Sequence, residues 1–177
     1  MKVLKNLFGN NTKINAKEIV YKDGNDNIKT LDEHLNKNIM TITYTPHNFT
    51  STAQWKDFKV EQGSITSSIG NKLTFENNEV QIGEGISHVL VSGTVNHGGA
   101  FRLSDYVLKI IRKRNETTEE MGRSYENGEH YYFSNNISPI LIEVNKGDSI
   151  YLAVSYSMSG SNTVEILESF MTVESIN

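Results

Sequence analysis

The chain has 177 residues, a formal net charge of −4 and no cysteine. This length is enough for one domain with a real core and a short appendage. The mild charge, without a long basic run, argues against a nucleic-acid partner, and no apolar stretch is long enough to span a bilayer. The lack of cysteine is consistent with assembly in a reducing cytoplasm.

The first 45 residues are predicted to form an attachment segment with a short helix. Thr30 and Glu33 match a capping box, which predicts a helix over about 30–42. Residues then recur at alternating spacings of three and four, as in a heptad seam: Ile28, Leu31, Leu35, Asn38 and Ile42. Asn38 would fix the register between parallel helices. A single amphipathic helix packed on another surface is the open alternative.

Residues 46–177 show alternating apolar residues between turns rich in Gly, Asn and Ser. The clearest hairpin places Ile140, Ile142 and Val144 on one face before a turn at Lys146–Asp148. Strands are predicted at 56–60, 64–68, 72–76, 79–82, 86–95, 104–113, 129–133, 138–144, 149–158 and 163–175. This spacing of strands indicates an all-β sandwich or barrel.

Two of the predicted strands are apolar on both faces. Along 104–113, Tyr106 lies on one face with Leu108 and Ile110, while Val107 and Ile111 lie on the other. Alternation also sends Tyr132 to the face opposite that of its two aromatic neighbours. An apolar outer face needs a cover, and a second copy of the chain would supply it.

No catalytic or cofactor motif occurs in the sequence. The five histidines lack metal-ligand spacing, and there is no nucleophile elbow, P-loop or dinucleotide fingerprint. We therefore expect no enzyme activity, no metal and no cofactor.

The polar stretch 115–128 is predicted to be a long loop. Recognition often resides in loops on a rigid β scaffold, so Arg123, Tyr125 and His130 are candidates to contact a host glycan or protein. A polar insertion without a binding role is the alternative.

Three parts of the chain resemble the jelly roll of tumour necrosis factor and the globular heads of complement-type proteins. They are Lys72–Phe75 with the strand up to Val95, Tyr106–Asn115, and Ile142–Leu152 with the last strand at Ser169–Val173. The resemblance implies an all-β jelly-roll sandwich, preceded by the short extended and helical attachment segment. It implies nothing about function by itself.

The N-terminal segment resembles the attachment ends of structural proteins in bacteriophages. The likeness rests on residues 14–24 followed by a Leu-x-x-x-Leu helix. It implies a homotrimeric virion protein of the head-fibre, tail-fibre or baseplate type, assembled in the host cytoplasm and anchored to other virion proteins through residues 1–45. Head and tail locations remain equally open. A stand-alone carbohydrate-binding module is the alternative.

Trimer contacts are expected from the seam and from apolar outward residues of the β domain. The seam contributes Ile28, Leu31, Leu35, Asn38 and Ile42, and the β domain contributes Tyr106, Ile111, Tyr132 and Phe170. Closed three-fold packing would hide these side chains, and trimerised sites would gain avidity for weak host-surface ligands.

Overall fold

The computed structural model describes residues 20–22, 28–30, 37–51, 55–98, 103–130, 132–157 and 162–176. The chain divides into two compact units, residues 1–37 and residues 38–177. In the first unit, β1 (Val20–Lys22) pairs antiparallel with β2 (Ile28–Thr30). The second unit, which we call the knob, is built from strands alone wherever it is described. No helix in the described part of the chain is long and apolar enough to cross a membrane.

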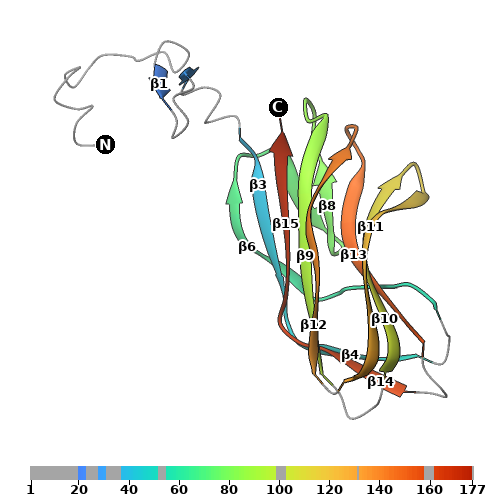
Figure 1. The fold of residues 1–177 in the computed structure, drawn as a ribbon. Helices are drawn as coiled ribbons and strands as arrows, with labels where there is room; N and C mark the ends of the chain where they lie inside the picture. The colour runs from blue at the N-terminus through green and yellow to red at the C-terminus, as the bar shows by residue number, and fades with distance from the viewer. Residues whose placement is uncertain are drawn as a thin grey trace. The chain divides into compact units, whose positions relative to one another are not determined.

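The knob consists of two antiparallel sheets (Figure 1). Sheet I has the order β4-β14-β9-β15-β3-β6, with β12 added on β9, and sheet II has the order β11-β10-β13-β8-β7, with β5 added on β13. The strands of sheet I are β3 (Ile39–Tyr44), β4 (His47–Ser51), β6 (Gly63–Ile69), β9 (His88–Gly98), β12 (Phe133–Glu143), β14 (Asn162–Ile166) and β15 (Ser169–Ile176). Those of sheet II are β5 (Phe58–Lys59), β7 (Leu73–Glu76), β8 (Glu79–Ile82), β10 (Leu103–Arg114), β11 (Thr117–His130) and β13 (Ser149–Ser157).

The core lies between the two sheets because each strand turns alternate residues inward. Val91 and Val173 from sheet I meet Leu108 and Leu152 from sheet II, and all four are buried. Each such side chain contributes about 1.5–3 kcal/mol of hydrophobic stabilisation. The sheets approach so closely at Gly93 that an added Cβ would lie 2.7 Å from Leu152 Cδ2.

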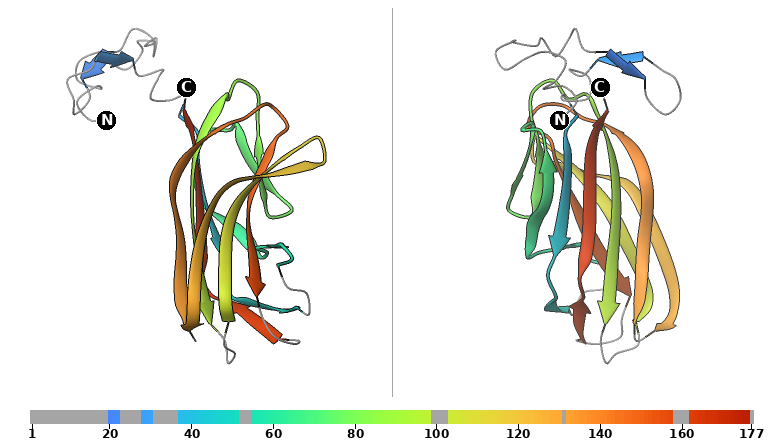
Figure 2. Two further views of the ribbon diagram at one scale, coloured as in Figure 1. Left: turned by 45° about the vertical axis from the view of Figure 1, so that its right-hand side comes forward. Right: turned by 90° about the vertical axis from the view of Figure 1, so that its left-hand side faces the viewer.

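The predicted helix over 30–42 is wrong where the structure describes it. Residues 28–30 form β2, and residues 39–44 form β3, which lies between β15 and β6 in sheet I (Figure 2). In β3, Met40, Ile42 and Tyr44 point into the core, so the period-two alternation outweighs the heptad spacing. The knob therefore begins at residue 38 and not at residue 46.

The predicted loop over 115–128 is also wrong, because this stretch forms β11. It pairs with β10 through a two-residue turn at Asn115 and Glu116, whose φ angles are 48° and 65°. Two consecutive residues with positive φ give a turn whose twist suits a tight hairpin. The polar composition of β11 reflects its place at the edge of sheet II, where one face meets solvent.

The two ends of the sandwich can be defined by the strand register. Asn38, where the chain enters the knob, receives a hydrogen bond from Ser175 N at its carbonyl oxygen (2.7 Å) and one from Lys72 N at its Oδ1 (3.1 Å). We call this the entry end. Strand β9 starts there, with His88 opposite Ile176, and runs to the far end. The far end is where His97 pairs with β12 and β14.

Candidate self-association surface

The outer face of sheet I carries a row of aliphatic side chains near the entry end. Strand pairing aligns Leu141, Leu90, Glu174, Ile39 and Ile69 across β12, β9, β15, β3 and β6. Leu141 is 61% exposed and Ile69 is 56% exposed. Glu174 is the one charged residue in this row. Two large aliphatic side chains are thus exposed to solvent, one near each edge of the outer face of sheet I.

The next rows toward the far end consist of small hydroxyl and amide side chains around Phe170. Register aligns Ser92, Thr172, Thr41 and Ser67 in one row, and Asn136, Thr94, Phe170 and Thr43 in the next. These side chains bond to one another within the sheet. Thr94 Oγ1 donates to Asn136 Oδ1 at 2.7 Å, and the hydroxyls of Thr41 and Thr172 lie 3.4 Å apart. We call these rows, with the four aliphatic side chains of the first row, the uncharged face; Glu174 borders it and is not counted in it.

A shallow hollow opens beside Phe170 on this face. It has a volume of about 310 Å³ and is lined by Ser92, Gly93, Thr94, Asn136, Ile137, Ser138, Phe170 and Thr172. The β12–β9 register shifts between Ile137 and Ile140, which separates the two strands locally. Among the described outward residues of these strands there is no Lys or Arg. A surface of this kind can be desolvated without stripping water from a cation.

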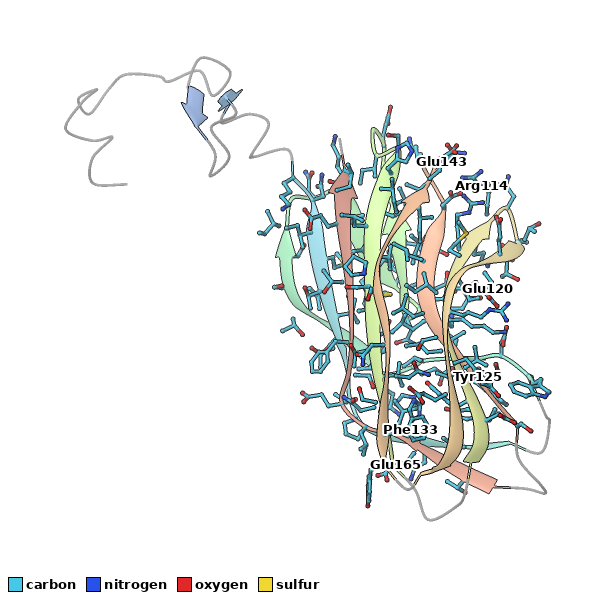
Figure 3. The ribbon with its side chains drawn as sticks, viewed as in Figure 1. Arg114, Glu120, Tyr125, Phe133, Glu143 and Glu165 are labelled. Carbon is cyan, nitrogen blue, oxygen red and sulfur yellow. The ribbon has the colours of Figure 1, made fainter. Side chains whose placement is uncertain are left out.

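The outer face of sheet II is different, because it is covered by ion pairs. Lys109 Nζ lies 2.8 Å from Asp57 and 3.5 Å from Glu120, and Lys59 Nζ lies 2.9 Å from Glu79. Figure 3 shows Glu120 and Tyr125 along this sheet. Arg112 pairs in the same way with Glu119. A charged face of this kind is adapted to water.

Val107 and Ile111 lie under these charges and need no partner. They are only 6% and 5% exposed. Their register neighbours on the outer face are Tyr125 and Ser155 for Val107, and Tyr151 for Ile111. The prediction that Ile111 contacts a second subunit is therefore wrong, because neighbouring strands of the same chain already cover it.

Three further predicted trimer contacts are also buried within one chain. Ile42 and Tyr106 lie in the core at 0% and 1% exposure, and Asn38 (2%) is hydrogen-bonded to the end of β15. None of these three can touch a partner without opening the sandwich. The helical seam is wrong at its described ends, since Ile28 lies in β2 and Ile42 in β3. Leu31 and Leu35 lie outside the described residues.

Two of the predicted trimer contacts remain exposed. Phe170 (38% exposed) lies in the uncharged face, whereas Tyr132 (73% exposed) lies at the far end, away from that face. The sequence analysis missed Leu90, Leu141, Ile39 and Ile69. The absence of Lys and Arg at alternate positions of 88–96, 134–143 and 170–176 was the available signal for them.

The three candidate recognition residues lie on strand β11 and not on a loop. Arg123 and Tyr125 are exposed on the outer face of sheet II, where Arg123 pairs with Glu120 and the Tyr125 hydroxyl donates to Asp105. His130 ends β11 opposite Leu103. The structure therefore brings Arg123 and Tyr125 together on one face, but within a network of ion pairs.

The turn at 145–148 holds the most buried ion pair of the described residues. Arg114 donates to Asp148 through Nε (2.9 Å) and Nη2 (2.7 Å), and Asn145 N donates to Asp148 Oδ2 at 2.9 Å. Burial raises the pKa of Asp148, but these hydrogen bonds outweigh it and hold the pKa below its usual range. This arrangement fixes the turn through which the chain passes from β12 in sheet I to β13 in sheet II. The predicted hairpin at this turn is wrong, because these two strands lie in different sheets and do not pair. No group of three metal-ligating side chains occurs among the described residues.

Comparison with known proteins identifies the fold. No family model and no curated protein matches the sequence. Among solved structures, murine APRIL is similar with a TM-score of 0.59 and 14% identity, over 79% of this chain and 99% of that one. The knob has a TNF-like jelly-roll fold. The all-β prediction is thereby confirmed.

Two further solved structures share this jelly roll. The vertex protein P5 of phage PRD1 has a TM-score of 0.54 and 14% identity, over 79% of this chain and 97% of that one. The globular domain of zebrafish complement 1qA has a TM-score of 0.53 and 10% identity, over 80% and 98% of the two chains. At these identities the likeness establishes the fold alone.

Proposed function

We propose that the chain is a non-enzymatic structural protein of a phage particle, in which three copies of the jelly-roll knob associate through their uncharged faces. The observation that carries the proposal is the contrast between the two outer faces. Sheet I exposes Leu141, Ile69 and Phe170 without a single Lys or Arg among its described outward residues, whereas sheet II is covered by ion pairs. Lysine is also depleted at the cores of protein interfaces, and the outward carboxylates Glu143 and Glu174 would then lie near the rim of the contact.

A closed trimer would bury the uncharged face of each copy. Both edges of the uncharged face carry an aliphatic side chain, Leu141 on β12 and Ile69 on β6. In a cyclic arrangement, one part of each copy's surface meets a different part of the next copy, so the contact closes into a ring without a free apolar edge. The hollow beside Phe170 offers room for a side chain of the neighbouring copy.

The location on a virion rests on two supports. The vertex protein P5 of PRD1 has the same fold, and the N-terminal unit is separate from the knob. We infer that the N-terminal segment docks on another virion protein, on the capsid or the tail, and that the knob projects from that site. Assembly would take place in the host cytoplasm.

A mass measurement tests the trimer. Light scattering of the full chain is expected to give three times the 19.9 kDa of one copy. A mass of one copy would overturn the proposal and favour the alternative, a stand-alone carbohydrate-binding module. The attachment role is tested separately by expressing residues 38–177, which should keep the trimer mass but fail to enter particles.

A further inference from the structure

The far end of the knob contains a cluster of aromatic residues around a buried histidine. The ring of His97 lies 4.1 Å from that of Tyr106 and is stacked on Phe133 at 4.8 Å, with Tyr156 at 6.0 Å. His97 occupies an inward position of β9, where the rest of the strand turns Val89, Val91 and Val95 to the core. A polar ring thus takes the last core position of this strand.

Three polar atoms of this cluster have no hydrogen bond among the described residues. Both ring nitrogens of His97 are buried without a hydrogen bond, as is the hydroxyl of Tyr106. Burial lowers the pKa of His97 to about 3, so the imidazole is neutral and offers one donor and one acceptor. Each unsatisfied buried group costs roughly 1–3 kcal/mol. Buried polar groups of a native protein are rarely left in this state, so the cluster calls for a structural or functional reason.

A hollow of about 390 Å³ opens at the surface beside this cluster, and the two ring nitrogens of His97 lie buried behind its lining. It is lined by Asn96, His97, Tyr132, Phe133, Leu167 and Glu168. Tyr132 is the most exposed large hydrophobic residue described, at 73%. The volume is in the range of small-ligand sites. An exposed tyrosine and a glutamate in its lining make this hollow unlike the one beside Phe170, which has no carboxylate in its lining.

Gly98 lets two side chains approach the backbone at the end of β9 closely. A Cβ at this position would lie 2.8 Å from Glu165 Oε2 and 3.0 Å from the ring of Tyr132. The carboxylate and the tyrosine ring therefore both lie against the same glycine. Figure 3 shows Glu165 and Phe133 at this end of the sandwich.

The charges around the hollow favour a ligand without a negative charge. The lining residues include Glu168 and no Lys or Arg, and the Glu165 carboxylate lies beside Tyr132. Carboxylates accept hydrogen bonds from hydroxyl groups and repel phosphate and carboxylate ligands. A neutral imidazole can both donate to and accept from hydroxyls. The apolar face of a ring would pack on Tyr132.

We propose that this hollow is a binding site for a neutral sugar ring, stacked on Tyr132 and hydrogen-bonded by the Glu168 carboxylate and by Asn96 Oδ1, since Asn96 Nδ2 already donates to the Glu168 carbonyl. A buried water could satisfy His97 alone, but it would leave the exposed Tyr132 and the open volume without a role. The biological meaning rests on the proposed function, since the far end is opposite the point where the chain enters the knob. Three copies would present three such sites and gain avidity for a glycan surface.

The site can be tested by NMR titration of the isotope-labelled full chain. The probes are glucose, galactose, mannose and N-acetylglucosamine, with N-acetylneuraminic acid as the anionic comparison. We expect the amide signals of Asn96, Tyr132 and Glu168 to shift with at least one neutral sugar and not with the acidic one. Tyr132→Ala should weaken that binding about tenfold or more. Ile65→Ala, which removes an exposed apolar side chain from β6, is the control and should leave binding unchanged.

The possible outcomes separate the two proposals. No shift with any of the four neutral sugars, or an equal loss in the Ile65 and Tyr132 variants, would overturn the sugar site. A trimer that binds no neutral sugar would overturn this site alone. A single copy that binds a neutral sugar at the far end would overturn the trimer and leave the site standing. Loss of binding in Glu168→Ala with an unchanged thermal midpoint would support direct contact over an effect on folding.

Discussion

The two outer faces of the sandwich meet their surroundings in opposite ways. Sheet II places Lys109 between Asp57 and Glu120 and covers Val107 and Ile111 beneath its charges. Sheet I carries hydroxyl, amide and aliphatic side chains, and its hydroxyl groups bond to one another. An antiparallel sheet with one face in water normally has polar or charged outward residues. The difference indicates that the outer face of sheet II is suited to water in a single copy, while the outer face of sheet I is suited to contact with another protein surface.

The largest expected effect comes from placing a charge at the centre of the uncharged face. Thr172 lies on β15, in the middle of sheet I, and three-fold packing would bring three copies of a new lysine into dry surroundings. Thr172→Lys should cost several kcal/mol of association and give a folded single copy in light scattering. The matched control is Thr74→Lys on the exposed β7 of sheet II, which should keep the trimer mass. A trimer in both variants would contradict the role of sheet I.

The second effect concerns acid, and it acts on folding and not on assembly. The pKa of Asp148 is lowered in the fold, so its pairing with Arg114 stabilises the knob fully above the ordinary carboxyl pKa near 4 and is lost as the pH falls through the folded value. Asp148→Asn should lower the free energy of unfolding by about 2 kcal/mol at neutral pH and flatten its decline in acid. Urea unfolding between pH 7 and pH 3 measures both. If Asp148→Asn left the pH dependence of the free energy of unfolding unchanged, Asp148 would not be the cause of the loss of stability in acid.

A smaller effect is expected from trimming the apolar residues of sheet I. Phe170→Ala and Leu141→Ala should each weaken association by about 1–2 kcal/mol, because their side chains leave a cavity in the interface. Sedimentation over a range of concentrations would show dissociation at about tenfold higher protein concentration. Tyr125→Ala on sheet II should not move the curve. An equal shift in that variant would indicate a general loss of stability.

The smallest effects belong to the ion pairs of sheet II and to salt. Arg123→Met removes one exposed cation from sheet II, with a side chain that is 65% exposed, and should change the free energy of unfolding by less than about 1 kcal/mol. The trimer mass should also be unchanged by added salt, because the uncharged face has no cation to screen. Dissociation in high salt would show that charged groups, and not sheet I, hold the copies together.

The sequence predicted the fold class because its alternation and turn residues are local signals. Strands β9, β10, β12 and β13 follow from residues such as Val89, Val91 and Val95, which lie two apart. The prediction of a helix was wrong because Ile42 fits both a heptad pattern and an alternating pattern. Only the pairing of β3 within sheet I shows which of the two patterns the chain follows. Strand β11 was predicted to be a loop because its own residues resemble those of a loop. Its strand conformation comes from pairing with β10, which the sequence does not show.

The candidate surfaces were harder to predict than the fold. Leu90 and Leu141 are far apart in the sequence and become neighbours only through the β9–β12 register. Val107 and Ile111 were assigned to an interface because a sequence cannot show that a neighbouring strand covers them. His97 gave no sequence signal, since a single strand histidine is usually structural. Its burial beside a hollow is visible only in the folded chain.

The most direct measurement of the central claim uses the absence of cysteine from the chain. Ser92→Cys places one thiol on the uncharged face, in β9, and Thr74→Cys places one on the open β7 of sheet II. Labelling with a maleimide is compared in the native and the denatured protein. The account predicts that the thiol at position 92 is protected in the native protein while that at position 74 reacts at once. Equal native labelling of the two thiols would contradict it.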